Sequence, residues 1–281
     1  MKSIIIVLLL ALLTLSPKNT AALAPSVGDV TDNRTTGQFF GRLEMELKLI
    51  GDEIGDADAV RLSLKKVVDD TGKDILNPEK IENGFKDLNE FGTKGNSVKF
   101  ELKNPSRKAA AIQELTGTIE MFIPKNDPNA VVTIPNFLAK TGKPFAEPAL
   151  KQANVELTIT TVAQEKELKQ KALEAQKAEA KKQGMSPEAI ASLGEMFDMG
   201  GGDNENSLNL KLSDPNNKLV AFTLTGPDGK EIRNNGSMTS NGLKTLYFSE
   251  KIPETATLTL KLATPKSVVA MPINMTNIPL P

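Results

Sequence analysis

The chain of 281 residues contains no histidine, no cysteine and no tryptophan, and it has a single tyrosine. Without histidine there is no imidazole base and no Ser-His-Asp triad. Without cysteine there is no thiol nucleophile, no zinc–thiolate or iron–sulfur site and no disulfide. A Ser-Lys dyad stays open in principle, but no recognisable signature surrounds Ser106-Arg107-Lys108. We therefore expect a chain that is not an enzyme, with no catalytic residue and no cofactor, held together by its hydrophobic core.

The chain also has no large excess of positive or negative charge. The 34 basic and 35 acidic residues are interspersed and leave a net charge of −1. Such a balance gives no long-range attraction for a polyanion or an anionic lipid surface. The composition therefore predicts no nucleic-acid partner and no electrostatic membrane partner.

The N-terminus has the pattern of an export signal. Lys2 is followed by an apolar run from Ile4 to Leu15, and small or helix-breaking residues follow that run. The run is about 12 residues long, whereas a bilayer-spanning helix needs roughly 20. We predict a signal peptide over residues 1–22, cleavage before Leu23 and no transmembrane segment in the mature chain. The predicted location is exported: periplasmic, secreted or cell-surface.

Alternating hydrophobicity is the main structural signal. Between Arg42 and Leu49 a leucine or methionine alternates strictly with a charged residue, which is typical of a strand with one buried face. At Lys65-Lys66 a second such run is interrupted, as at a β-bulge or a strand end. Further strands are predicted at 60–64, 98–102, 119–123, 131–134, 155–159, 208–212, 219–224, 243–248, 258–262 and 268–273.

Many short strands separated by turn residues favour a mainly β fold made of two antiparallel immunoglobulin-like β-sandwiches, with a barrel as the alternative. The predicted domains are 23–162 for the first sandwich, 163–203 for a helical insertion between the strand blocks, and 204–281 for the second sandwich. Gly72 and Gly229 lie in two similar turns, where we expect a positive φ.

Residues 164–183 are rich in Ala, Glu, Lys and Gln and lack glycine and proline, so they predict a helix that ends at Gly184. Its large apolar residues are few, and most of its surface is expected to face water or a partner. Ser186-Pro187 predicts the start of a second short helix, whose apolar face includes Ile190.

Paired carboxylates could support hydrolysis of the glycosidase kind. Asp69 with Asp70, and Glu44 with Glu46, are the pairs that lie close in sequence. Glu44 and Glu46 occupy the solvent face of their predicted strand, and aromatic residues, which commonly form sugar platforms, make up only 4% of the chain. A carboxylate-dependent hydrolase, with or without calcium, is therefore the alternative interpretation.

Calcium is the metal whose oxygen ligands this chain could supply. Two acidic loops offer them, and neither matches an EF-hand; we expect solvated loops and leave the metal site unassigned. One loop contains Asp52, Glu53, Asp56 and Asp58, and the other contains Asp203, Asn204 and Glu205.

Two stretches, residues 100–119 and 268–281, resemble a group of exported bacterial proteins of unknown function with tandem immunoglobulin-like domains. The shared features are a strand, a Pro-x-Arg-x-Ala turn at 105–109, a Leu-x-Gly strand at 115–117 and a closing strand that begins at Pro272. The resemblance implies a fold and no catalytic residues. For Arg107 we expect pairing with a neighbouring carboxylate rather than anion binding.

Together these observations predict an exported, non-enzymatic binding or structural protein of the bacterial envelope. It would act through protein–protein contacts, and the expected contact surfaces are the 164–183 helix and the edge strands, which can accept a partner strand.

Overall fold

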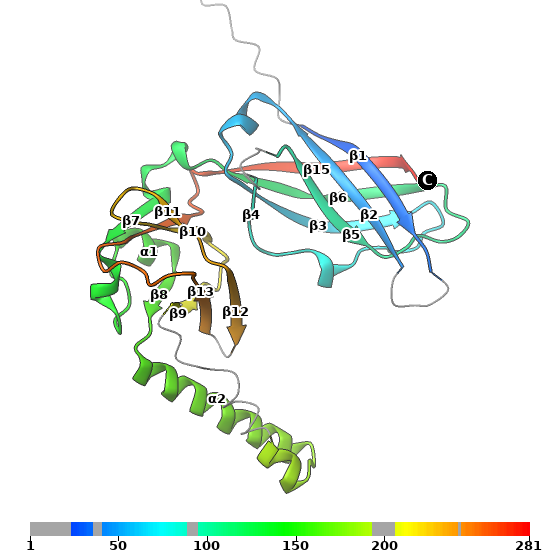
Figure 1. Cartoon of the computed structure of the whole chain (residues 1–281). Coiled ribbons are helices and arrows are strands. Elements are labelled where there is room, and N and C mark those ends of the chain that lie inside the picture. Colours follow the sequence, from blue (N-terminus) through cyan, green and yellow to red (C-terminus); the bar gives the residue numbers. More distant parts are fainter. Residues whose placement is uncertain (1–23, 36–40, 89–94, 193–205, 241–242) are drawn as a thin grey trace, which may run out of the picture.

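The computed structural model describes residues 24–35, 41–88, 95–192, 206–240 and 243–281, and it is mainly β (Figure 1). The predicted signal peptide and the acidic residues 203–205 lie outside these ranges. Strands form four antiparallel sheets, which confirms the predicted mainly β class. No described helix combines the length and the hydropathy needed to cross a bilayer.

Two sheets share the larger hydrophobic core, and we call them the first sheet pair. One has the strand order β1-β2-β5 and the other β15-β6-β3-β4. The strands are β1 (Ala24–Asn33), β2 (Arg42–Ile50), β3 (Ala59–Asp69), β4 (Lys86–Asp87), β5 (Ser97–Leu102), β6 (Ala111–Phe122) and β15 (Val268–Pro279).

The other two sheets share a second core, and we call them the second sheet pair. Their strand orders are β11-β10-β14-β7 and β12-β13-β9-β8. The strands are β7 (Val131–Pro135), β8 (Glu156–Ile159), β9 (Ser207–Ser213), β10 (Leu219–Thr225), β11 (Glu231–Ile232), β12 (Gly236–Ser240), β13 (Leu243–Tyr247) and β14 (Thr257–Leu262).

The strand pairing differs from the grouping expected along the sequence. β15, the last strand, pairs with β6 over Val268↔Phe122 to Pro279↔Ala111 and so belongs to the first sheet pair. β7 and β8 precede residue 162 but pair with β14 and β9 of the second sheet pair. Residues 131–262 are thus inserted between two neighbouring antiparallel strands, and the predicted division at 162 and 204 does not follow the sheets. Periodicity identifies a strand without identifying its partner.

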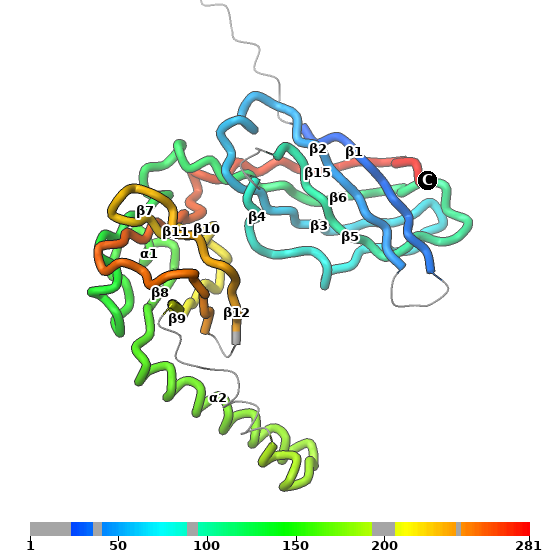
Figure 2. The backbone as a smooth tube through the Cα atoms, in the orientation of Figure 1, coloured from blue at the N-terminus to red at the C-terminus, as the bar shows by residue number. Residues whose placement is uncertain are grey.

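The chain crosses between the sheet pairs twice, at residues 123–130 and 263–267, and the two crossings are bonded together. The Ser267 carbonyl accepts the Ile123 N–H at 2.7 Å, and the Thr264 hydroxyl donates to the Asp127 carboxylate at 2.6 Å. Asp127 also caps the short helix that follows it, by accepting the Asn129 N–H. Figure 2 shows these crossings as neighbouring connections between the two halves of the tube.

Side chains add further contacts across this joint. Lys261 on β14 bonds to Asp58 at 2.6 Å. Arg61 on β3 donates across the joint to the Asn217 carbonyl, and within the first sheet pair it lies over the Phe85 ring and pairs with Glu120 at 2.6 Å. A small apolar cluster that includes Phe122 and Val220 fills the space between the two sheet pairs.

A β-bulge accounts for the glycine of the Leu-x-Gly stretch. The register of β3 against β6 shifts between Leu64 and Lys66, as the interruption at Lys65-Lys66 predicts. Gly117 lies opposite, and a Cβ placed there would come within 2.3 Å of the Ser63 carbonyl oxygen. The turn glycines Gly72 and Gly229 have φ values of +85° and +80°, which confirms the expected positive φ.

Among the described residues, one helical segment is long and the others are short. The helical segments are η1 (Asp52–Asp56), η2 (Pro78–Lys80), η4 (Pro124–Asn126), η5 (Pro128–Ala130), η6 (Phe137–Lys140), α1 (Pro148–Ala153), α2 (Val162–Lys182) and a helical stretch at 187–192. In α2 a capping box between Thr161 and Gln164 satisfies the first free N–H groups, and Gly184 follows its end with φ +76°.

The helix α2 confirms the sequence prediction for residues 164–183 and extends away from the sheets (Figure 1). Only its start is bonded to the second sheet pair, where Glu165 accepts from the Asn209 amide at 2.6 Å. The predicted cap of the second helix is present, since the Ser186 hydroxyl accepts the Ala189 N–H. Of the apolar face predicted there, residues 193–199 lie outside the described ranges.

Candidate binding groove

A groove of about 410 Å³ lies over the outer face of the β1-β2-β5 sheet. Antiparallel pairing places its side chains in two rows across the strands. Thr31, Glu44 and Glu101 form one row, because Glu44 is directly opposite both of the others. Glu46 and Lys99 are directly opposite each other in the next row. The remaining charged lining residues are Asp29 on β1, Lys80 and Glu82 in the segment before β4, and Lys86 on β4.

Carboxylates from different elements therefore meet in one place. Directly opposed acids such as Glu44 and Glu101 repel each other. Arg42 offsets this repulsion, because its guanidinium lies 2.5 Å from Glu44 and 3.4 Å from Glu101. The hydrogen bond and the charge of Glu44 raise the pKa of Arg42 above its ordinary value. The row is held as an ion-paired cluster on an exposed sheet face.

Glu46 lies at the centre of the second row, opposite a bulge in β1. Val27 pairs with Leu47 and Val30 with Met45, so Gly28 and Asp29 together face Glu46. A Cβ on Gly28 would come within 2.9 Å of the Glu46 carboxylate. The absence of a side chain at Gly28 therefore leaves room for that carboxylate over β1.

The pKa of Glu46 lies below its ordinary value. The largest cause is a hydrogen bond from the Ser97 side chain; burial opposes it, and the Asp29 backbone and the charges of Lys99 and Lys48 add to the lowering. A general acid needs the opposite shift, so that its proton is retained near neutral pH. Glu46 is thus suited to accept hydrogen bonds and to pair with cationic groups, and it is not suited to donate a proton.

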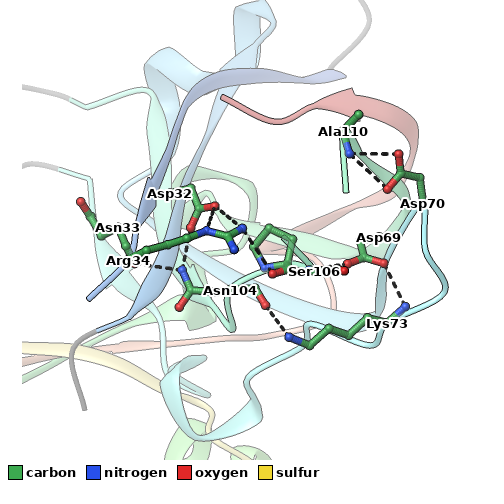
Figure 3. A network of polar contacts seen from close by, with 10 residues as sticks. Asp32, Asn33, Arg34, Asp69, Asp70, Lys73, Asn104, Ser106 and Ala110 are labelled. Atoms are coloured by element: carbon green, nitrogen blue, oxygen red, sulfur yellow. Dashed lines mark hydrogen bonds and ion pairs between the residues drawn. The ribbon is translucent and has the colours of Figure 1, made fainter. Parts of the chain in front are cut away.

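The predicted pair Asp69 and Asp70 lies outside this groove, at one end of the first sheet pair (Figure 3). Asp69 is 1% exposed and accepts hydrogen bonds from the N–H groups of Thr71, Lys73 and Ser106 and from the Thr71 hydroxyl. Asp70 accepts the Ala110 N–H at 3.0 Å. The two carboxylates thus hold separate parts of the chain and do not form an acid–base pair.

Burial opposes the charged form of Asp69, but the bonds from Ser106, Thr71 and Lys73 outweigh it and lower its pKa. Asp69 is therefore a buried anion satisfied by backbone amides. Its role is to join the turn after β3 to the segment between β5 and β6.

The expected pairing of Arg107 with a carboxylate is not found among the described residues and stays a prediction. Arg107 is exposed, and within the described ranges it forms no ion pair. The arginine that contacts this turn is Arg34, which pairs with Asp32 at 2.6 Å and donates to the Pro105 carbonyl (Figure 3). The sequence around a turn arginine does not distinguish a local partner from a distant one. It could therefore not predict that Arg34 contacts this turn.

Of the acidic residues considered for calcium, Asp52 and Glu53 are exposed in η1, and the other two of that loop are engaged by lysines. Asp56 pairs with Lys125, and Asp58 pairs with Lys261. Over the described part of the chain, no group of three or more acidic side chains is arranged to hold a metal ion. The other acidic loop, residues 203–205, lies outside that part.

No protein-family model matches the chain, and neither a curated protein nor a solved structure matches it significantly. The resemblance to exported immunoglobulin-like proteins thus depends on the two stretches at 100–119 and 268–281 and stays a prediction. In the structure these stretches contain β6 and β15, which pair with each other.

Proposed function

We propose that this chain is an exported, non-enzymatic binding protein of a bacterial envelope that acts through protein–protein contacts in the charged groove over β1, β2 and β5. The fold that accompanies this proposal is a pair of immunoglobulin-like β-sandwiches, with α2 as a helical insertion between strands. The observation that carries the proposal is the two cross-strand rows of polar and acidic or basic side chains, which lie together in a groove of about 410 Å³. Such fixed charges select a partner by complementarity.

A photo-crosslinking residue at position 31 tests the groove. Thr31 is exposed and lines the groove, whereas Thr133 on β7 is exposed on the second sheet pair and serves as the matched control. In cells of the producing organism we expect a discrete protein adduct from position 31, lost when Glu46→Lys is added. Equal adducts from positions 31 and 133, or no adduct from position 31, would contradict a binding groove there.

Export is tested separately. The mature protein, isolated from the periplasm or the medium of its producing cells, is expected to begin at Leu23. Protein that stays in the cytoplasm with Met1 intact would contradict the proposed envelope location. This outcome would not affect the groove experiment.

The alternative function is a carboxylate-dependent hydrolase, and one observation favours it: acids from three strands converge in the groove, with Glu44 directly opposite Glu101. The lowered pKa of Glu46 opposes its use as the general acid, and Arg42 engages both Glu44 and Glu101 in ion pairs. A panel of glycoside and ester substrates distinguishes the two. Turnover that disappears in Glu44→Gln and Glu101→Gln would establish the hydrolase in place of the binding protein.

A further inference from the structure

The strand β12 is an edge of the second sheet pair that lacks the usual protection. An exposed edge presents free backbone N–H and C=O groups, and proteins commonly guard it with charges, prolines or bulges. Among the described edge strands, each of the others contains a charged residue or a proline. These residues are Asp29 in β1, Lys99 in β5, Lys86 in β4, Pro272 in β15, Glu231 in β11, Pro135 in β7 and Glu156 in β8.

The sequence of β12 is Gly-Ser-Met-Thr-Ser, without charge or proline. It pairs with β13 in a regular register from Gly236↔Tyr247 to Ser240↔Leu243, and no described strand pairs with its other side. Ser237, Met238 and Thr239 are exposed, with Met238 43% exposed. The strand thus offers an uncharged, unbulged backbone edge to solvent.

A cavity of about 200 Å³ lies close to the start of β12, although no β12 residue lines it: its lining includes Arg233 and Asn234, which precede β12, and Leu246 on the neighbouring strand β13. Ser237 is directly opposite Leu246, which is buried in the second core and also lines the cavity. Its lining is mixed: Thr223, Glu231, Arg233 and Asn234 are polar or charged, and the apolar lining residues are Phe222, Leu224, Ile232, Leu246 and Phe248. A strand added to β12 would direct every second side chain toward this cavity.

The unprotected edge of β12 and the nearby cavity together indicate which kind of molecule would bind here. We infer that β12 accepts an extended segment of another protein, which adds a strand to the sheet and places one large apolar side chain in the cavity. Backbone hydrogen bonds supply affinity in this mode of recognition, and the side-chain pocket supplies specificity.

A second copy of this chain fits less well than a different protein. Alternation places Ser237 and Thr239 on the cavity side of β12 and Met238 on the opposite side, since Met238 is opposite Thr245. Self-pairing about a two-fold axis would therefore bring only small polar side chains to the cavity. The partner segment must supply a residue that β12 itself lacks.

The test uses a displayed library of random nine-residue peptides selected on the full chain, followed by affinity measurements with the enriched peptides. Ser237→Lys places a charge on the exposed edge, and Thr133→Lys makes a comparable change on the edge strand β7 as the control. We expect peptides with a large apolar residue to be enriched. Their binding should weaken at least about tenfold in Ser237→Lys and stay unchanged in Thr133→Lys.

Hydrogen exchange supplies a second measurement. Bound peptide should slow exchange of the amides from Ser237 to Thr239. The inference is overturned if no peptide is enriched, if Ser237→Lys binds as well as the unchanged chain, or if ultracentrifugation shows a dimer that Ser237→Lys dissociates. None of these outcomes bears on the groove of the first sheet pair, so the two proposals can fail separately.

Discussion

The two sheet pairs differ in how completely their strands are covered. In the first pair, the inward residues of β2 from Leu43 to Leu49 are 0–1% exposed, and β6 and β15 each extend over 12 residues. In the second pair, β10 has seven residues, of which only Leu224 is buried. Both pairs use the same alternating pattern. In the first pair, long strands such as β6 and β15 pair with each other over nearly their whole length, whereas shorter strands leave a cavity and an uncharged edge in the second.

Truncating one leucine on β2 and one on β9 should show this contrast most strongly. Leu47→Ala removes a side chain that is 0% exposed, and we expect the free energy of unfolding to fall by about 2–5 kcal/mol. Leu212→Ala on β9, where the side chain is 36% exposed, should cost about 0.5 kcal/mol. Urea unfolding followed by circular dichroism measures both. Equal losses would show that exposure does not distinguish the two cores.

The buried anion of the first pair gives the next largest effect. Asp69→Asn replaces an acceptor oxygen by an amino group that faces N–H donors, and we expect a loss of about 2–3 kcal/mol. Asp214 is the matched residue of the second pair, since its half-buried carboxylate accepts the Lys218 and Leu219 N–H groups. Asp214→Asn should cost about 1 kcal/mol. The comparison fails if Asp214→Asn is the more damaging change in urea unfolding.

Backbone crowding gives a smaller difference. Gly117→Ala forces a Cβ against the Ser63 carbonyl in the bulge of β3, and the expected loss is about 1–3 kcal/mol. Gly236→Ala on β12 meets no atom within 4 Å, so its thermal midpoint should stay close to that of the unchanged chain. A destabilised Gly236→Ala together with a neutral Gly117→Ala would reverse the contrast.

The smallest expected effect is on the pH dependence of stability, to which the buried Asp69 of the first sheet pair contributes. The folded-state pKa of Asp69 lies below its ordinary value of 3.8, so its contribution to stability is fully present above that value. The contribution is lost as the pH falls through the lower, folded pKa. Urea midpoints at pH 7 and pH 3 should therefore differ less in Asp69→Asn than in the unchanged chain. Asp127 also has a lowered pKa, through Thr264, and should preserve part of the dependence in the variant. If the urea midpoint changes equally between pH 7 and pH 3 in Asp69→Asn and in the unchanged chain, Asp69 does not contribute to the pH dependence.

Local patterns predicted much of the fold. The alternation from Arg42 to Leu49 is β2, the interruption at Lys65-Lys66 is a bulge, and the alanine-rich segment is α2. Where alternation is absent, strands were missed. β1 contains the Gly28–Asp29 bulge, and β12 is exposed on both faces, so neither has a buried side with a two-residue period.

The groove could be predicted only in part. Glu44 and Glu46 were identified as outward residues of β2, because the period-2 pattern assigns them to that face. Lys99 and Glu101 reach the groove through the register of β5 on β2, and Lys80 through the segment before β4. Register between distant strands is set by the packed core, which no local pattern encodes.

The insertion of residues 131–262 between β6 and β15 has a consequence for the order of folding during synthesis. β6 leaves the ribosome long before β15, its neighbour across the sheet, whereas the strands of the inserted part are all available earlier. One edge of β6 therefore stays unpaired until residues 268–279 emerge, and strand pairing over such a long sequence separation is in general slow and exposed to aggregation.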